Sequence, residues 1–282
     1  MTHSSLDAWF GGVAARLCGI PVVRLRHLST PTRAGLNSYL LYKKLADFVV
    51  TTSTSAASLI LEQTRLPKEK CLCVPTGVEP SELKVSQAEV KKFREQLGVS
   101  HEDCLVGTAC FVRSWKGVQD LLQAAALLKG EKRIKWVIIG GGYIDQYIPL
   151  ARELGLEKQV IFTGHLDIPY AAIAALDIFL LLSTAHEGIS QASLQAAYLA
   201  RPLITTPIGG LPEVCLDGKT GLIVPPRSPE RVAEAVLALA RDTERRISFG
   251  SAGKKLVEEK FIFTYTLNQM ERIYTLMEAR KK

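Results

Sequence analysis

The segment Ile178-Phe-Leu-Leu-Leu182-Ser-Thr-Ala-His-Glu187-Gly188-Ile-Ser190 decides the fold class of this chain. Its apolar start, Ile178 to Leu182, predicts a buried strand, and a helical pattern begins near Ser190. The polar loop between them carries one acid and one glycine. A carboxylate, a bare backbone and a helix N-terminus therefore converge beyond the strand, which is typical of a pocket for a phosphorylated ligand.

Short apolar runs alternate with amphipathic stretches on both sides of this segment. The predicted strands are 20–26, 47–52, 71–75, 105–110, 136–139, 160–163, 178–182, 203–205 and 222–224. The main predicted helices are 6–17, 36–45, 55–62, 118–129, 146–154, 190–199 and 229–240, and no element is predicted in the polar passage 79–102. Because parallel strands need crossover connections, this order predicts an α/β fold with parallel sheets covered on both faces.

The alternation predicts two domains of unequal completeness. Residues 81–263 supply six strands, enough for a complete Rossmann-like domain, whereas residues 1–80 supply three, about half of one. The first domain is therefore expected to be either naturally small or incomplete at its start. Apolar residues at Leu267, Met270, Ile273 and Leu276 predict a helix over 264–282 that packs back across the junction onto the first domain.

Composition indicates an ordinary globular protein with an anionic partner. Of the 282 residues, 47% are hydrophobic and 22% charged, and the formal charge of +7 attracts phosphates. Lysine and arginine are scattered, which argues against nucleic acid as a partner. The start of the chain does not have the pattern of a signal peptide, and no apolar run reaches the length of a spanning helix, so we expect no integral membrane segment. The six cysteines do not have the paired spacing of a zinc site or a disulfide framework. We therefore expect reduced, buried thiols in a cytoplasmic protein. The cysteines are Cys18, Cys71, Cys73, Cys104, Cys110 and Cys215.

Four landmarks in the second domain resemble the retaining glycosyltransferases of family 4. They are Val106-Gly-Thr-Ala-Cys-Phe-Val-Arg113-Ser-Trp-Lys116-Gly117, Val137-Ile-Ile-Gly140-Gly-Gly142, Val160-Ile-Phe-Thr-Gly164, and the passage 187–213 with its continuation Asp217-Gly-Lys-Thr-Gly221. Stretches 3–7, 20–27 and 74–78 resemble the family's first domain from midway onward. The resemblance implies the GT-B fold, two Rossmann-like domains, and a sugar taken from a nucleotide diphosphate donor. It also implies that the family's opening quarter, with its glycine-rich turn, is missing.

The resemblance assigns the cations and the acid of the donor site. Arg113 and Lys116 follow a strand end, where they would neutralise the diphosphate leaving group. Many family members have the arginine two positions earlier, where this chain has Phe111. Glu187 matches the first glutamate of the family's paired signature, which contacts a hydroxyl of the transferred sugar. Backbone N–H groups of three residues after it would bind the diphosphate, namely Gly188, Ile189 and Ser190, and Ser190 also suits a helix cap.

Further residues take their roles from the same resemblance. The second signature position is Gln195 rather than glutamate, and its amide oxygen still accepts bonds from a ribose without charge assistance. His27 resembles a histidine that faces the donor sugar across the cleft. Gly164 and His165 lie where the loop that contacts the base begins. Four of these side chains also have a plainer interpretation, as a solvated charge for Arg113 and Lys116, a surface acid near a helix start for Glu187, and a surface or loop residue for His27.

The resemblance implies sugar transfer with retention at the anomeric carbon. The donor phosphate removes the acceptor proton in such a reaction, so neither a side-chain base nor a metal or other cofactor is expected. The acceptor is expected to be a glycan or lipid-linked molecule, such as lipopolysaccharide or another cell-surface polysaccharide. Basic residues of the first domain suit contact with an anionic membrane surface, which predicts a cytoplasmic protein held peripherally at the inner face of the cell membrane. Scattered solvating charge explains these residues equally well. The basic residues are Arg16, Arg24, Arg26, Arg33, Lys43 and Lys44.

Two other functions remain open from the sequence. A catalytically inactive remnant that binds a nucleotide sugar is favoured by the missing opening quarter and by Gln195. A nucleotide-sugar epimerase of the same general fold would interconvert the sugar without any acceptor.

Overall fold

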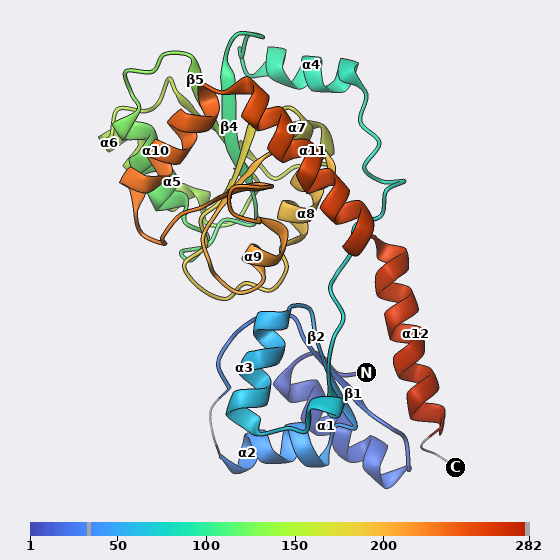
Figure 1. Ribbon diagram of the computed structural model, residues 1–282. Helices are drawn as coiled ribbons and strands as arrows, with labels where there is room; N and C mark the ends of the chain where they lie inside the picture. The colour runs from blue at the N-terminus through green and yellow to red at the C-terminus, as the bar shows by residue number, and fades with distance from the viewer. Residues whose placement is uncertain (33–34, 280–282) are drawn as a thin grey trace.

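The computed structural model describes residues 1–32 and 35–279 and shows two lobes (Figure 1). The small lobe holds a parallel sheet of β1 (Val23–Arg26), β2 (Phe48–Thr51) and β3 (Cys71–Cys73) in that order. The large lobe holds a six-stranded parallel sheet in the order β6-β5-β4-β7-β8-β9. The predicted α/β class with parallel sheets is confirmed.

Three helical segments accompany the strands of the small lobe. These are α1 (Ser5–Leu17), α2 (Leu36–Tyr39), which runs into a π-helical turn at Leu40–Lys44, and α3 (Thr54–Thr64). Ser4 starts α1 because its side chain accepts from the Asp7 amide while the Asp7 carboxylate accepts from the Ser4 amide. A short 3₁₀ turn at Lys68–Lys70 leads into β3.

The large lobe contains every strand predicted for it. The strands are β4 (Cys104–Ala109), β5 (Ile134–Ile139), β6 (Val160–Gly164), β7 (Ile178–Leu181), β8 (Leu203–Thr205) and β9 (Gly221–Ile223). The helices are α5 (Val118–Leu127), α6 (Ile148–Glu153), α7 (Tyr170–Ala174), α8 (Gln191–Tyr198), α9 (Leu211–Val214), α10 (Pro229–Ala240) and α11 (Thr243–Lys260), with a 3₁₀ turn at Ile144–Gln146.

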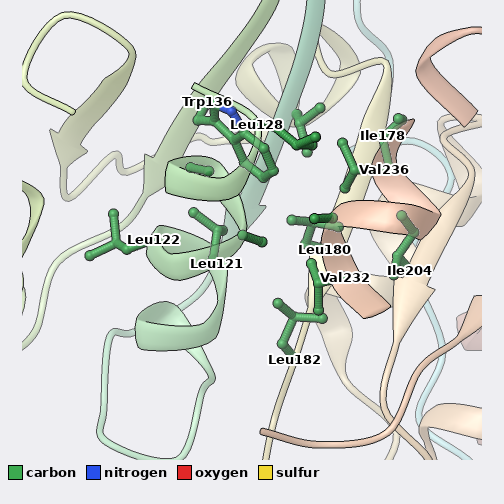
Figure 2. Close-up of a cluster of buried hydrophobic side chains, with 14 of the residues drawn as sticks. Leu121, Leu122, Leu128, Trp136, Ile178, Leu180, Leu182, Ile204, Val232 and Val236 are labelled. Atoms are coloured by element: carbon green, nitrogen blue, oxygen red, sulfur yellow. The ribbon is translucent and has the colours of Figure 1, made fainter. Parts of the chain in front are cut away.

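Both faces of the large sheet are buried. On one face α5 and α10 pack on the strands around Trp136, and Figure 2 shows Leu121 and Val236 in this layer. On the other face Phe179 packs with Leu194 of α8 and residues of α11. Burial on both faces explains why these strands read as continuous apolar runs.

The order of the large sheet reverses beside its central strand. Strand β4 pairs with β5 on one side and with β7 on the other, so two strands that are neighbours in space are separated in sequence. In open α/β sheets a crevice forms outside the carboxyl ends of the strands at such a switch point. The fold therefore places the loops after β4, β5, β6 and β7 around one crevice.

The polar passage 79–102 contains a helix that the sequence reading missed, α4 (Gln87–Gln96). No residue of α4 is fully buried, and only Val90 and Phe93 of its apolar residues pack, partly buried, against the core of the large lobe. The helix begins at Ser86, whose side chain accepts from the Glu89 amide. Arg94 anchors its other end by donating to the Asp177 carboxylate at 3.0 Å and the Ala175 carbonyl at 2.9 Å.

The final helix, α12 (Phe263–Ala279), runs alongside the small lobe (Figure 1). Ile273 and Met277 are buried in one cluster with Val23, Phe48 and Val50 of the small sheet. The C-terminal end of the chain therefore supplies one face of the small lobe's core. Residues from Arg280 onward lie outside the described part of the chain.

The lobes are joined where the chain crosses between them twice. Val78 donates to the Phe261 carbonyl and accepts from the Phe263 amide, both at 2.8 Å, so the two crossings lie side by side. A Cβ on Gly77 would lie 2.5 Å from the Ile262 carbonyl carbon, which explains the glycine at this close approach.

The prediction of buried cysteines is wrong for Cys18, which is exposed at the end of α1. Cys104 and Cys215 are buried, and Cys71, Cys73 and Cys110 are half-buried. No helix within the described ranges is both long and apolar enough to cross a bilayer.

Candidate functional site

A pocket of about 280 Å³ lies at the carboxyl ends of the large lobe's strands. Cys110 and Phe111 line it after β4, and His165 lines it after β6. Gln191 and Gln195 of α8 form the opposite wall. Of the residues predicted to bind the nucleotide, the structure thus places His165 and Gln195 around one cavity, and Gly164 directly precedes His165.

Two glycines allow the loop after β5 to approach the loop after β4. Gly140 has φ +126° and Gly142 has φ +102°, values that L side chains rarely adopt. A Cβ on Gly140 would overlap the Cys110 carbonyl oxygen, and one on Gly142 would lie 2.5 Å from the Val112 carbonyl oxygen. The bare backbone of this loop therefore forms the floor of the pocket.

Glu187 lies almost fully buried beside the pocket and is paired with Lys116. The Lys116 Nζ is 2.5 Å from Glu187 Oε1, and the Ser183 hydroxyl donates to the same oxygen at 2.5 Å. The side chains are 19% exposed for Lys116 and 4% for Glu187. Both bonds end on Oε1, so neither of them occupies Oε2. The strand ends of β4 and β7 thus bring together a cation and an acid separated by 71 residues.

The backbone after Glu187 offers free donors. In the part of the chain that the structure describes, the amides of Gly188, Ile189 and Ser190 donate to no protein acceptor. Ser190 is the N-cap of α8, and its hydroxyl accepts from the Ser193 amide at 3.4 Å. These three amides therefore lie directly before the first turn of α8, a place where an anion is favoured.

The small lobe touches this loop directly. Ser29 donates its amide at 3.2 Å and its hydroxyl at 2.5 Å to the Glu187 carbonyl oxygen. A Cβ on Gly188 would overlap the His27 carbonyl oxygen, to which the Thr52 hydroxyl donates at 3.0 Å. The backbone of His27 therefore lies against the loop that follows Glu187.

The ring of His27 stacks on a second histidine. The rings of His3 and His27 are parallel, with centroids 5.3 Å apart and Nδ1 of His3 3.0 Å from Nε2 of His27. Although His27 as a residue is exposed, the burial of its ring lowers its pKa from 6.5, and the nearby His3 lowers it further. This arrangement favours a neutral imidazole at pH 7.

Arg113 lies beside the site without joining the Lys116–Glu187 pair. Its guanidinium is held over two rings, 5.0 Å from the centroid of Phe111 and 5.2 Å from that of Trp115. Arg113 has no ion pair among residues 1–32 and 35–279. Trp115 also packs edge-on against His186, the residue before Glu187, whose φ is +59°.

Several residues that contribute to the site were not predicted from the sequence. Ser183 and Ser29 fix the side chain and the carbonyl of Glu187, but a lone serine after a strand or in a loop has no distinguishing pattern. His3 also went unassigned, because its partner His27 is 24 positions away. No motif links such residues, and only the folded chain brings them together.

Two basic residues of the small lobe are engaged by other residues of the same lobe. Arg24 is only 2% exposed and stacks on Tyr42 at 4.6 Å, so its proposed place on a surface that contacts anionic lipid is wrong. Arg16 pairs with Asp47 at 3.0 Å. Arg33 lies outside the described residues. Nowhere in the described ranges do three histidine, cysteine or acidic side chains gather as a metal site would need.

Comparison with known proteins identifies the family. Residues 89–256, more than half of the chain, match the family model described as glycosyl transferases group 1. The protein belongs to this family, and its two Rossmann-like lobes are those of the GT-B fold.

The relatives include enzymes from archaea and bacteria. The uncharacterized glycosyltransferase MJ1069 of Methanocaldococcus jannaschii is 28% identical over 83% of this chain and 59% of its own length. The N-acetyl-alpha-D-glucosaminyl L-malate synthase of Bacillus anthracis is 29% identical over 66% of this chain and 49% of its own. The chain thus spans about half the length of these curated relatives.

A solved structure matches almost the whole chain in fold. The Anabaena protein HepE in complex with UDP superposes with a TM-score of 0.89 at 20% identity, covering 96% of this chain and 77% of HepE. Both lobes are therefore included in the likeness.

Proposed function

We propose that this protein is a retaining glycosyltransferase that moves a sugar from a nucleotide diphosphate donor to a glycan or lipid-linked acceptor. The observation that carries the proposal is the Lys116–Glu187 pair, which stands beside three free amides at the start of α8. Cation, acid and amides are the groups needed to hold a diphosphate and the sugar attached to it.

The donor fits the site from the pocket toward the small lobe. We place the base against Gly164 and His165, and the ribose against Gln195, because His165 and Gln195 line the 280 Å³ pocket and Gly164 directly precedes His165. The diphosphate then lies over the amides of residues 188–190, with Lys116 beside it. An ammonium has three donors, and only one is used by Glu187, so Lys116 can bind both groups at once.

The sugar comes to lie between Glu187 and His27. The Oε2 atom of Glu187 can accept a hydrogen bond from a sugar hydroxyl and oppose the positive charge that develops at the anomeric carbon. The neutral ring of His27 can exchange hydrogen bonds with the same sugar from the small lobe. Arg113, two positions beyond the family's usual arginine, adds positive charge at the rim.

The proposed reaction needs no added base or metal. The bond between the anomeric carbon and the donor phosphate oxygen breaks, the acceptor oxygen forms a new bond on the same face, and the acceptor proton passes to the leaving phosphate. Lys116 and the amides stabilise the charge that develops on that phosphate. The protein's own contribution is therefore positioning and electrostatic stabilisation.

The names of the relatives support a nucleotide-sugar donor. HepE binds UDP and UDP-glucose, and a mycobacterial relative is named a GDP-mannose-dependent mannosyltransferase of phosphatidylinositol monomannoside. We therefore include a lipid-linked acceptor, at the inner face of a cell membrane, in the proposal. Candidate cations for contact with that membrane are the exposed Lys44 and the half-buried Lys43, each 5.7 Å from the Tyr39 ring centroid.

Calorimetry with uridine, guanosine and adenosine diphosphates tests the donor site. We expect one of them to bind, and binding of none would refute the proposal. Nucleotide release from matching nucleotide sugars, with and without added glycan, then separates the alternatives. Binding without turnover would indicate a non-catalytic remnant, and interconversion of the sugar without an acceptor would indicate an epimerase.

A further inference from the structure

The first turn of α3 in the small lobe is bound by an acid from the large lobe. Glu213 Oε1 accepts from the Thr54 amide at 2.8 Å, from the Thr54 hydroxyl at 2.8 Å and from the Ser55 amide at 3.4 Å. The N-terminus of an 11-residue helix carries a partial positive charge, so a carboxylate is favoured there. The contact joins residues 159 apart in sequence.

The turn that carries Glu213 also touches the donor site. A Cβ on Gly210 would lie 2.8 Å from the Ser53 Cβ, and one on Gly209 would overlap the Glu187 carbonyl oxygen. That carbonyl is the acceptor for Ser29. The Glu213 contact, the Ser29 contact and the carbonyl of Glu187 therefore form one continuous interface between the lobes.

We propose that Glu213 is a positioning residue that holds the two lobes closed and thereby fixes the backbone of Glu187. The proposal rests on the proposed function, since it concerns the same site. The lobes are covalently joined at the paired crossings around Val78, and a rotation about that pairing can leave its backbone bonds intact. The same rotation separates Glu213 from Thr54 and Ser29 from Glu187.

Two variants act on the contact from opposite sides, and only the Ser55 amide at 3.4 Å is left as a donor in the second of them. Glu213→Ala removes the acceptor. Thr54→Pro removes both the amide and the hydroxyl donor, and it suits the local backbone, because Thr54 is the first helical residue and Ser53 before it is extended at φ −147° and ψ 153°. Glu234→Ala is the matched control, since Glu234 is an exposed acid of the large lobe that pairs with Arg231 on its own helix.

Small-angle scattering and kinetics measure the result. We expect both variants to increase the radius of gyration of the free protein and to lower kcat about tenfold, while the affinity for the nucleoside diphosphate changes less than twofold because that site belongs to the large lobe. Glu213→Gln keeps an acceptor oxygen and should fall between wild type and Glu213→Ala. The double variant should be no worse than Glu213→Ala, because Glu213→Ala already removes every bond of this contact.

The outcomes distinguish the role proposed for Glu213 from the proposed glycosyltransferase function. An unchanged radius of gyration in both single variants, or additive losses in the double variant, would overturn the role of Glu213. If the wild-type protein binds no nucleotide, the proposed function fails, but the scattering comparison still decides whether Glu213 holds the lobes closed. Circular dichroism checks that each variant is folded. If Glu213→Ala does not fold, Thr54→Pro alone is used for the scattering and kinetic comparison.

Discussion

Glu187 is fixed at both its side chain and its backbone. Lys116 and Ser183 hold one carboxylate oxygen, while Ser29 of the other lobe holds the carbonyl. An ionised carboxylate in so buried a place is tolerated only with such partners. The residue therefore depends on Lys116 for stability as well as for any chemistry at the site.

Replacing Lys116 tests this dependence. Lys116→Ala leaves the buried Glu187 carboxylate without its cation, and we expect the free energy of unfolding to fall by about 3 kcal/mol, near the lower end measured for broken buried pairs. Nucleoside diphosphate binding should also weaken by at least ~1 kcal/mol, as for a lost charge-assisted bond. Denaturant unfolding and calorimetry measure the two effects.

The control for Lys116 is Lys219→Ala, at an exposed position outside the site. Lys219→Ala should change neither the free energy of unfolding nor the affinity for the nucleoside diphosphate. A Lys116→Ala protein as stable as wild type would contradict the burial argument, and unchanged nucleotide affinity would remove Lys116 from the donor site.

The stacked histidines predict a pH dependence. The folded-state pKa of His27 is below 6.5, so its contribution to stability is fully present above about pH 6.5 and is lost as the pH falls through the lowered value. His3→Ala removes one of the two causes, and the pKa of His27 should rise toward 6.5 without reaching it, because burial remains. Nuclear magnetic resonance titration of the imidazole protons measures this pKa. The exposed His101 provides the control variant, His101→Ala, and equal His27 values in His3→Ala and wild type would disprove the coupling.

At the scale of elements, the site is a set of strand ends. The loops after β4, β5 and β6 line the pocket, and the loop after β7 carries Glu187. Such ends meet because the strands are parallel and β4 lies between β5 and β7. Elements away from the crevice, such as α4, contribute stability through their caps instead.

The helix α4 shows what a cap contributes where no residue of the helix is fully buried. Ser86→Ala removes the side-chain acceptor for the Glu89 amide, and we expect the free energy of unfolding to fall by about 1 kcal/mol. Denaturant unfolding provides the measurement. Ser251→Ala, within α11, serves as the control and should leave stability equal or slightly higher, because alanine favours the helix interior. No difference between the two variants would mean that the cap does not stabilise α4.

At the scale of the whole molecule, the last helix, α12, packs against the sheet of the small lobe. The last helix leaves the large lobe and packs on the sheet formed by the first residues of the chain (Figure 1). Ile273 is 3% exposed in that contact. The small lobe is thus built from both ends of the sequence, and the paired crossings around Val78 connect it to the large lobe.

Truncating Ile273 should destabilise the small lobe. Ile273→Ala leaves a cavity against Val23 and Phe48, and we expect a loss of about 2–5 kcal/mol in the free energy of unfolding, a typical range for buried isoleucine. Leu276→Ala, on the exposed side of the same helix, should have little effect. Hydrogen exchange resolves the location, since amides of β1 and β2 should exchange faster while those of β4 do not. Uniform acceleration in both lobes would contradict this assignment.

The sequence alone determined the α/β class and most of the individual elements. Buried parallel strands are continuous apolar runs, and this local signal placed every strand of the large sheet. Ordered motifs with Lys116, Glu187 and Gly140 also marked the loops that meet at the crevice, because strand ends of a parallel sheet share one edge. Helix α4 was not predicted because its apolar residues are few, Val90 and Phe93 among charged residues, while its Ser86 cap and the bonds of Arg94 leave no periodic signal in the sequence.

Only the tertiary structure decided which groups act on one another. Lys116 and Glu187 are 71 residues apart, and Thr54 and Glu213 are 159 apart, so no local pattern could pair them. The burial of Arg24 and the stacking of His27 on His3 likewise follow from packing between distant segments. Hydrogen bonds and ion pairs depend on distances of a few ångströms, and those distances are set by how the elements and the two lobes pack together.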